Sequence, residues 1–247
     1  MASDYYPTSP YLYCGGDPIN LIDPTGENPV YDMAGNFLGC TSEGFTGMIM
    51  FYTGTEFIDP TQYTLSELQS SAGNDLITFD EARESNSSGI LESAYSRIWT
   101  HVASQFEGLQ VYDEVFSMSS IDGGKIGYKQ IEKGEWETIH YPERDDLLPI
   151  ITGSGTYPYE STVENIASSI IVHEFYSHGK KHCRFECKSH RLAYKNVINF
   201  KQLWNKTTDK YKAFNLNMLL RYTRKETGRK QVDKPYRRLY NKYVIKE

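Results

Sequence analysis

The chain has 247 residues, of which 39% are hydrophobic and 23% are charged, and this balance is sufficient to form a folded core and excludes a disordered chain. The sequence lacks a run of about 18 apolar residues, so it predicts no membrane span, and residues 1–20 have neither the basic start nor the apolar stretch of a signal peptide. The four cysteines are scattered and imply no disulfide framework.

The first 26 residues are rich in proline and in turn sequences. Prolines at positions 7, 10, 18 and 24 block helix formation, and the pairs Asp-Pro and Thr-Gly favour turns. The same segment resembles the end of the core of bacterial Rhs/YD-repeat proteins, where a comparable motif closes the repeat shell. The matching residues are Ser9, Pro10, Tyr11, Tyr13, Cys14, Pro18, Asn20, Asp23, Pro24 and Gly26.

In that family the segment after this motif is the variable C-terminal toxin of a polymorphic toxin system. The resemblance therefore implies that residues 1–27 are the tail of an Rhs core and that an effector for interbacterial competition follows. It implies that this effector is secreted or delivered into a target cell as part of a larger protein. The expected partners are the remainder of the Rhs shell and a cognate immunity protein.

The predicted effector begins with a mixed strand and helix part, residues 28–152. A hairpin is predicted at 31–38 and a further strand at 48–52, whereas residues 60–88 are polar and mixed and predict no regular element. Apolar residues recur at helical spacing from Ile90 to Phe106, which predicts a buried helix. Residues 124–142 alternate like a strand pair, on which His140 would lie.

A helical part, residues 153–247, is predicted to follow. Ser161 and Glu164 form a capping-box pattern, and the apolar run after them continues into His173, with Gly179 as the expected C-cap. Further helices are predicted at about 190–204, 208–223 and 234–244. The fold class is therefore α+β, with a strand-rich N-terminal region that contains one buried helix and a C-terminal helical half.

Residues 173–178 read His-Glu-Phe-Tyr-Ser-His and could supply two zinc ligands and a general base. The common zinc-peptidase signature has its histidines four residues apart, but His173 and His178 are five apart. On a regular α-helix they would point about 140° away from each other, so we expect a π-bulge that returns both to one side. The spacing resembles the His-Glu-x-x-x-His motif of the dipeptidyl peptidase III family, which implies His173 and His178 as zinc ligands and Glu174 as the base.

The third ligand is expected downstream, and His190 is preferred because it begins a predicted helix that could face the first. His182 and Glu186 are additional candidates, and Tyr176 is a possible further site residue. One alternative is a structural zinc site formed by Cys183, Cys187 and His190 with His178 or His182. Another is a surface pair of Glu174 and His178, with His173 as a hydrogen-bonded core residue.

Charge divides the chain at Gly179. There are 6 Lys and Arg against 27 Asp and Glu through Gly179, and 20 against 5 from Lys180 onward. The basic helices could pack on the acidic surface of the same molecule, or they could bind nucleic acid, an anionic wall polymer or an acidic immunity protein. Tyrosines interleave with Lys and Arg at 221–225 and 235–243, a pattern suited to stacking on bases.

Three functions follow from these patterns. The first is a zinc-dependent, peptidase-like hydrolase that acts on a protein or a cell-wall peptide. The second is a metal-dependent nuclease toxin that uses the same His and Glu residues and the basic C-terminus. The third is a non-enzymatic interaction module in which the His-Glu helix is only structural.

Overall fold

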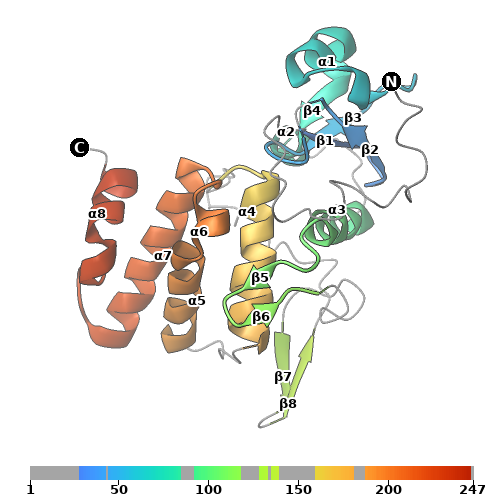
Figure 1. The fold of residues 1–247 in the computed structure, drawn as a ribbon. Coiled ribbons are helices and arrows are strands. Elements are labelled where there is room, and N and C mark those ends of the chain that lie inside the picture. Colours follow the sequence, from blue (N-terminus) through green and yellow to red (C-terminus); the bar gives the residue numbers. More distant parts are fainter. Residues whose placement is uncertain are drawn as a thin grey trace.

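The computed structural model describes residues 28–42, 44–84, 92–117, 128–132, 135–138, 159–180 and 187–245. It confirms the α+β class: in the described part of the chain, short strands alternate with helices in the first part, and helices alone make up the last part (Figure 1). The Rhs-like motif at residues 9–26 and His140 lie outside the described residues. No helix of the described part is both long enough and apolar enough to cross a membrane.

A four-stranded sheet, ordered β2-β1-β3-β4, opens the described chain. Its strands are β1 (Pro29–Tyr31), β2 (Phe37–Cys40), β3 (Met50–Tyr52) and β4 (Leu76–Thr78). The predicted hairpin is confirmed, because β1 and β2 pair antiparallel across a turn in which Asp32 Oδ1 accepts hydrogen bonds from the backbone of Ala34 and Asn36. Strand β3 pairs parallel with β1 and antiparallel with β4.

The segment 60–84, for which the sequence predicted no regular element, contains several. They are η2 (Pro60–Gln62), α1 (Leu65–Ala72), η3 (Gly73–Asp75), strand β4 and α2 (Phe79–Glu84). Helix α1 begins with a capping box in which Thr64 and Glu67 bond reciprocally. Only Leu68 of this helix is buried, so the segment carries too weak an apolar periodicity to predict a helix.

The predicted buried helix is α3 (Glu92–Ser104), which buries Ile98, Trp99 and Val102. Two small hairpins follow it, β5 (Gln110–Val111) with β6 (Glu114–Val115), and β7 (Tyr128–Glu132) with β8 (Glu135–Thr138). The second hairpin is the strand pair predicted at 124–142.

A central helix runs through the helical part as α4 (Val163–Ala167) and then the π-helix η6 (Ser168–Lys180). Its N-cap is Thr162, whose hydroxyl accepts the backbone N–H of Asn165, so the predicted capping box of Ser161 and Glu164 is wrong. The carboxylate of Glu164 instead accepts the backbone N–H of Gly47. The predicted C-cap at Gly179 is also wrong, because the helix continues through Lys180.

Four helical segments follow the central helix: α5 (Cys187–Asn199), α6 (Lys201–Trp204), α7 (Asp209–Thr227), and the C-terminal run of η7 (Lys234–Tyr236), α8 (Arg237–Tyr240) and η8 (Asn241–Ile245). Helix α5 packs against the central helix, α7 packs against α5, and the C-terminal run packs against α7. These correspond to the three helices predicted after residue 190. Figure 1 shows α5, α7 and α8 on one side of the central helix and the four-stranded sheet beyond its other side.

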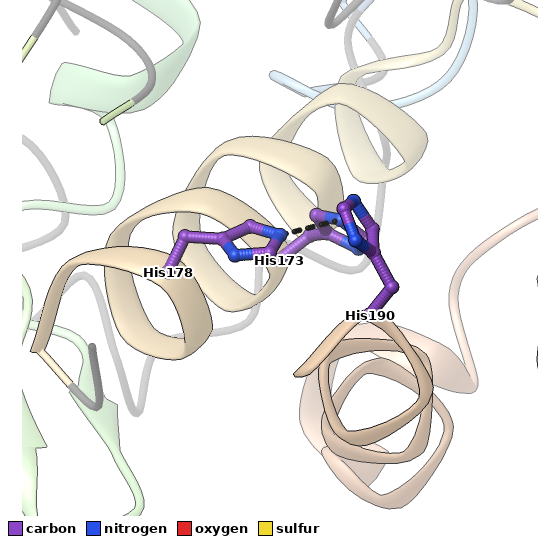
Figure 2. A group of neighbouring side chains, drawn as sticks. All are labelled: His173, His178 and His190. Atoms are coloured by element: carbon purple, nitrogen blue, oxygen red, sulfur yellow. Dashed lines mark hydrogen bonds between the residues drawn. The ribbon is translucent and has the colours of Figure 1, made fainter. Parts of the chain in front are cut away.

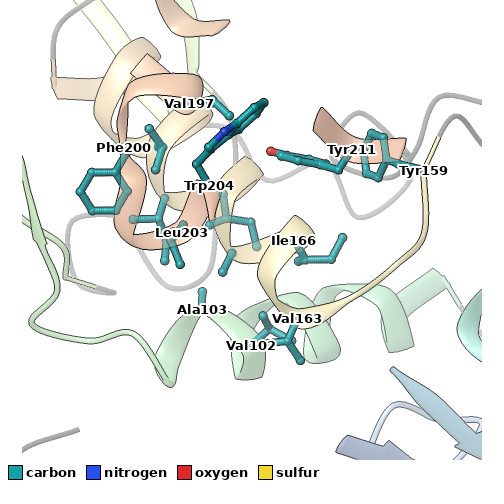
Figure 3. Packing of buried hydrophobic residues seen from close by; sticks show 14 of the residues in the cluster. Val102, Ala103, Tyr159, Val163, Ile166, Val197, Phe200, Leu203, Trp204 and Tyr211 are labelled. Carbon is teal, nitrogen blue, oxygen red and sulfur yellow. The ribbon is translucent and has the colours of Figure 1, made fainter. Parts of the chain in front are cut away.

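The core joins the two predicted parts of the chain. One cluster of buried side chains extends from Tyr31 in β1 to Tyr236 in η7. Figure 3 shows part of this cluster, where Val102 of α3 lies near Val163 and Ile166 of α4. Burial of these apolar surfaces holds the central helix between α3 and the C-terminal helices.

Candidate metal centre

The central helix is buried along almost its whole length. From Ser161 to Gly179, every residue is buried except His173 and Glu174. A helix that is enclosed on all sides is apolar all round, and Ile170, Ile171, Val172 and Phe175 supply that apolar surface. Before its last residue, Lys180, this helix therefore reaches solvent at the His-Glu pair.

The π-helical turn brings His173 and His178 together. Their Nε2 atoms are 3.2 Å apart and their ring centroids 5.0 Å apart. In a π-helix the backbone bonds run from residue i to residue i+5, so side chains five positions apart lie above one another. The π-bulge expected from the five-residue spacing is confirmed, and it extends over the whole of η6.

His190, the preferred third ligand, joins this pair from α5. The candidate ligand atoms of the three histidines all lie within 4.8 Å of one another. Figure 2 shows His173 and His178 projecting from the central helix toward His190 on the neighbouring helix. The three histidines could hold a metal ion.

The donor geometry fits a small tetrahedral ion. Two imidazole nitrogens bound to zinc at about 2.0–2.1 Å in a tetrahedral arrangement lie roughly 3.3 Å apart. The 3.2 Å separation of the Nε2 atoms of His173 and His178 matches that edge. The side chain of His190 comes to this pair from a separate helix, α5.

Electrostatics keep His173 in the form that binds metals. Burial, together with the proximity of His178 and His190, holds the pKa of His173 well below its usual value of 6.5. The ring is therefore neutral near pH 7, and a neutral imidazole has a lone pair for a metal ion.

Glu174 lies beside the histidines. Its Oε1 is 3.9 Å from Nε2 of His173, and its side chain is 16% exposed. The carboxylate is thus near the ligand atoms and in contact with solvent, as a base that deprotonates a metal-bound water requires. The alternative of a surface pair between Glu174 and His178 does not fit, because His178 is only 2% exposed and its ring faces His173.

Two tyrosines that the sequence analysis did not identify complete the surroundings of the histidines. The ring of Tyr194 meets that of His173 edge to face at 4.8 Å, and the ring of Tyr222 stacks on His190 at 4.8 Å. Tyr194 is four residues after His190 on α5, so helical spacing could have identified it. Tyr222 belongs to α7, and the local sequence carries no signal of its contact with His190.

The remaining predicted site residues are placed elsewhere or lie outside the described part. Tyr176 donates its hydroxyl to Oδ1 of Asp113 in the β5–β6 turn, so that hydroxyl is directed at the hairpin. His182, Cys183 and Glu186 lie outside the described residues, as does the side chain of Cys187. The rival Cys/His site is thus not described, while His178 and His190 belong to the histidine group.

Several basic residues of α5 and α7 form ion pairs, and one of these pairs, Lys210 with Glu160, joins the basic part of the chain to the acidic part. Arg191 contacts Glu226 and Asp233, and Lys195 also contacts Asp233. The interleaved tyrosines turn inward: Tyr222, Tyr240 and Tyr243 all pack against the core. The alternation of Tyr with Lys and Arg is therefore the pattern of amphipathic helices with partly buried rings, and base stacking by these residues stays a prediction.

Comparison with known proteins gives no match, either among family models, among curated proteins or among solved structures.

Proposed function

We propose that the protein is a zinc-dependent hydrolase in which His173, His178 and His190 hold the metal and Glu174 is the general base. The observation that carries this proposal is the convergence of three imidazoles from two helices. One of them, His173, forms with Glu174 the only partly exposed pair in the otherwise buried segment Ser161–Gly179. Neutral imidazole is a ligand that zinc shares with copper, iron and nickel. A three-histidine set leaves a fourth coordination position open, which is typical of catalytic zinc rather than structural zinc.

The chemistry divides between the ion and the chain. Bound zinc would supply Lewis acidity and lower the pKa of a coordinated water to about 7. Glu174 would accept the proton of that water and pass it to the leaving group. Tyr194 and Tyr222 would hold the His173 and His190 rings in place and limit the access of bulk water.

The proposed substrate is a peptide or amide bond in a protein or a cell-wall peptide. The support for this choice is the His-Glu-x-x-x-His sequence, which resembles that of a zinc peptidase family and places a carboxylate directly after the first ligand. The Rhs-like motif at residues 9–26 supports a role as a toxin delivered from a larger protein. A neutralising immunity protein would be its natural partner.

The replacement of Glu174 by Gln tests this proposal. The variant should retain its metal but lose hydrolysis of peptide and cell-wall fragments by on the order of a hundredfold or more, since only the proton acceptor is removed. It should also lose the ability to arrest bacterial growth on expression. Glu107→Gln, at an exposed carboxylate, is the matched control. Hydrolysis at the wild-type rate in Glu174→Gln would refute the mechanism.

A specific observation favours a metal-dependent nuclease as a second candidate. Lys225 Nζ lies 5.4 Å from the centroid of Tyr222, the ring that stacks on His190. Arg221 and Arg224 are exposed on the same helix, so the helix that contacts His190 through Tyr222 carries positive charge. Such a surface binds polyanions with strong dependence on salt. Cleavage of DNA or RNA that requires metal, and that weakens when Arg221, Arg224 and Lys225 are replaced by Ala, would favour this candidate over the peptidase.

A further inference from the structure

A buried side-chain hydrogen bond joins Ser177 and Val172, the two residues that directly precede His178 and His173. Ser177 donates its hydroxyl to the backbone carbonyl of Val172 at 2.7 Å, across five residues. Ser177 immediately precedes His178, and Val172 immediately precedes His173. The side chain of Ser177 is fully buried, so water does not compete for this bond.

This contact depends on the widened turn. In an α-helix, a serine hydroxyl that bonds back to the backbone reaches the carbonyl three or four residues earlier. In the π-helix, the backbone N–H of residue 177 is directed at the carbonyl of residue 172. The hydroxyl of Ser177 reaches the same carbonyl, so one residue contributes two contacts that favour the i to i+5 register.

A neighbouring helix holds this serine in place. Asn196 of α5 donates its side-chain N–H to Oγ of Ser177 at 3.0 Å. The backbone carbonyl of Asn196 in turn accepts the hydroxyl of Tyr112 at 2.7 Å. Tyr112 lies in the β5–β6 turn with φ at 56°, a left-handed conformation that is uncommon for a residue other than glycine. The hydroxyl of Ser177 is therefore held by one partner on α5, and the backbone of that partner is held in turn by Tyr112.

We infer that Ser177, oriented by Asn196, is a positioning residue that maintains the five-residue register on which the pairing of His173 and His178 depends. In an α-helical register the two rings would point about 140° apart and could not share an ion. The same helix α5 carries both Asn196 and His190, so one element supplies the third ligand and holds the register of the other two. The inference rests on the proposed metal site.

Metal affinity in three single variants of the full chain tests this inference. Metal-free protein is titrated with Co²⁺, whose visible absorption reports both occupancy and coordination number, and Zn²⁺ competition then gives the zinc affinity. Ser177→Ala and Asn196→Ala should each weaken binding by about tenfold to a hundredfold, the range seen when groups that orient metal ligands are removed. Cobalt that does bind to these variants should give an altered spectrum.

Ser169→Ala is the control. Ser169 is a buried serine of the same π-helix, and its hydroxyl contacts Tyr211 at 3.1 Å on another element. Its removal deletes a buried side-chain hydrogen bond but leaves the bond between Ser177 and Val172 intact, so metal affinity should stay within about threefold of wild type.

The outcomes separate this inference from the proposed function. Equal metal affinities in Ser177→Ala, Asn196→Ala and Ser169→Ala would overturn the role of Ser177 while leaving the metal centre intact. Failure of the wild-type protein to bind Co²⁺ or Zn²⁺ would overturn both. Should Ser177→Ala not fold, Asn196→Ala decides the question, because Asn196 is only half-buried.

Discussion

The Nε2 atoms of His173 and His178 lie 3.2 Å apart, although an α-helix would direct these side chains to different faces. The π-helix from Ser168 to Lys180 accounts for this proximity. Segments of π-helix are rare and occur frequently at functional sites. Here the widened helix changes a spacing unsuited to metal binding into one that matches two ligand positions of a tetrahedral site.

His190→Ala should lower zinc affinity by at least about tenfold, because one of three ligands is lost. Tyr222→Phe is the matched control, since it keeps the ring that stacks on His190 and removes only the hydroxyl. Zinc competition against a chromogenic chelator measures both variants. An unchanged affinity in His190→Ala would transfer the third position to another residue, with His182 and Glu186 as the first to test.

Glu164→Gln should stabilise the protein at neutral pH. Burial raises the pKa of the Glu164 carboxyl above its ordinary 4.5, so the folded state retains this proton more strongly than the unfolded state does. The stability contributed by this group is complete below pH 4.5 and is lost as pH rises through the raised pKa. Each unit by which burial raises the pKa corresponds to about 1.4 kcal/mol in the free energy of unfolding.

Denaturant unfolding of Glu164→Gln and wild type at pH 4 and pH 7 measures this effect. Glu164→Gln should be more stable than wild type at pH 7, and the free energies of unfolding of the two proteins should be equal at pH 4. Glu67→Gln should behave oppositely, since hydrogen bonds from Thr64 hold the pKa of Glu67 below its usual value. That carboxylate stabilises the fold above its unfolded pKa and loses this effect as pH falls. A wild-type advantage over Glu164→Gln at pH 7 would contradict the assignment.

Thr208→Ala should cost more stability than Thr64→Ala. Both threonines are N-caps, and removal of a cap costs about 1 kcal/mol. The hydroxyl of Thr64 forms an exposed capping box. The hydroxyl of Thr208 caps α7, donates to Glu160 at 2.8 Å and accepts from Asn165 at 3.0 Å. We expect a loss of about 2 kcal/mol in the free energy of unfolding for Thr208→Ala, and equal losses in the two variants would show that these extra bonds contribute nothing.

The sequence predicted those parts of the site that follow from local spacing. The five-residue interval from His173 to His178 required a π-turn if both were ligands, and the helical pattern after His190 placed it on a rigid element. The contacts of Tyr222 with His190 and of Asn196 with Ser177 join separate helices. Their geometry depends on tertiary packing, which local periodicity does not encode.

The elements of the fold that were predicted are likewise those with a strong local pattern. Helix α3 and the three helical regions after residue 187 were predicted from apolar residues at helical spacing. Helix α1 and strand β4 were missed, because Leu68 is the only buried residue of α1 and Leu76 is the only buried residue of β4. The helix start at Thr162 was misassigned to Ser161, because both residues are good caps and their neighbours in space decide between them. Thr162 is the one whose hydroxyl accepts from the backbone of Asn165.

Metal content is the most direct test of the central claim. Elemental mass spectrometry of the purified protein, after loading with zinc and removal of unbound ions, should find about one zinc per chain. The double variant His173→Ala, His178→Ala should have lost it. Absence of zinc from the wild-type protein, or its retention in the double variant, would contradict the assignment of these histidines as a metal centre.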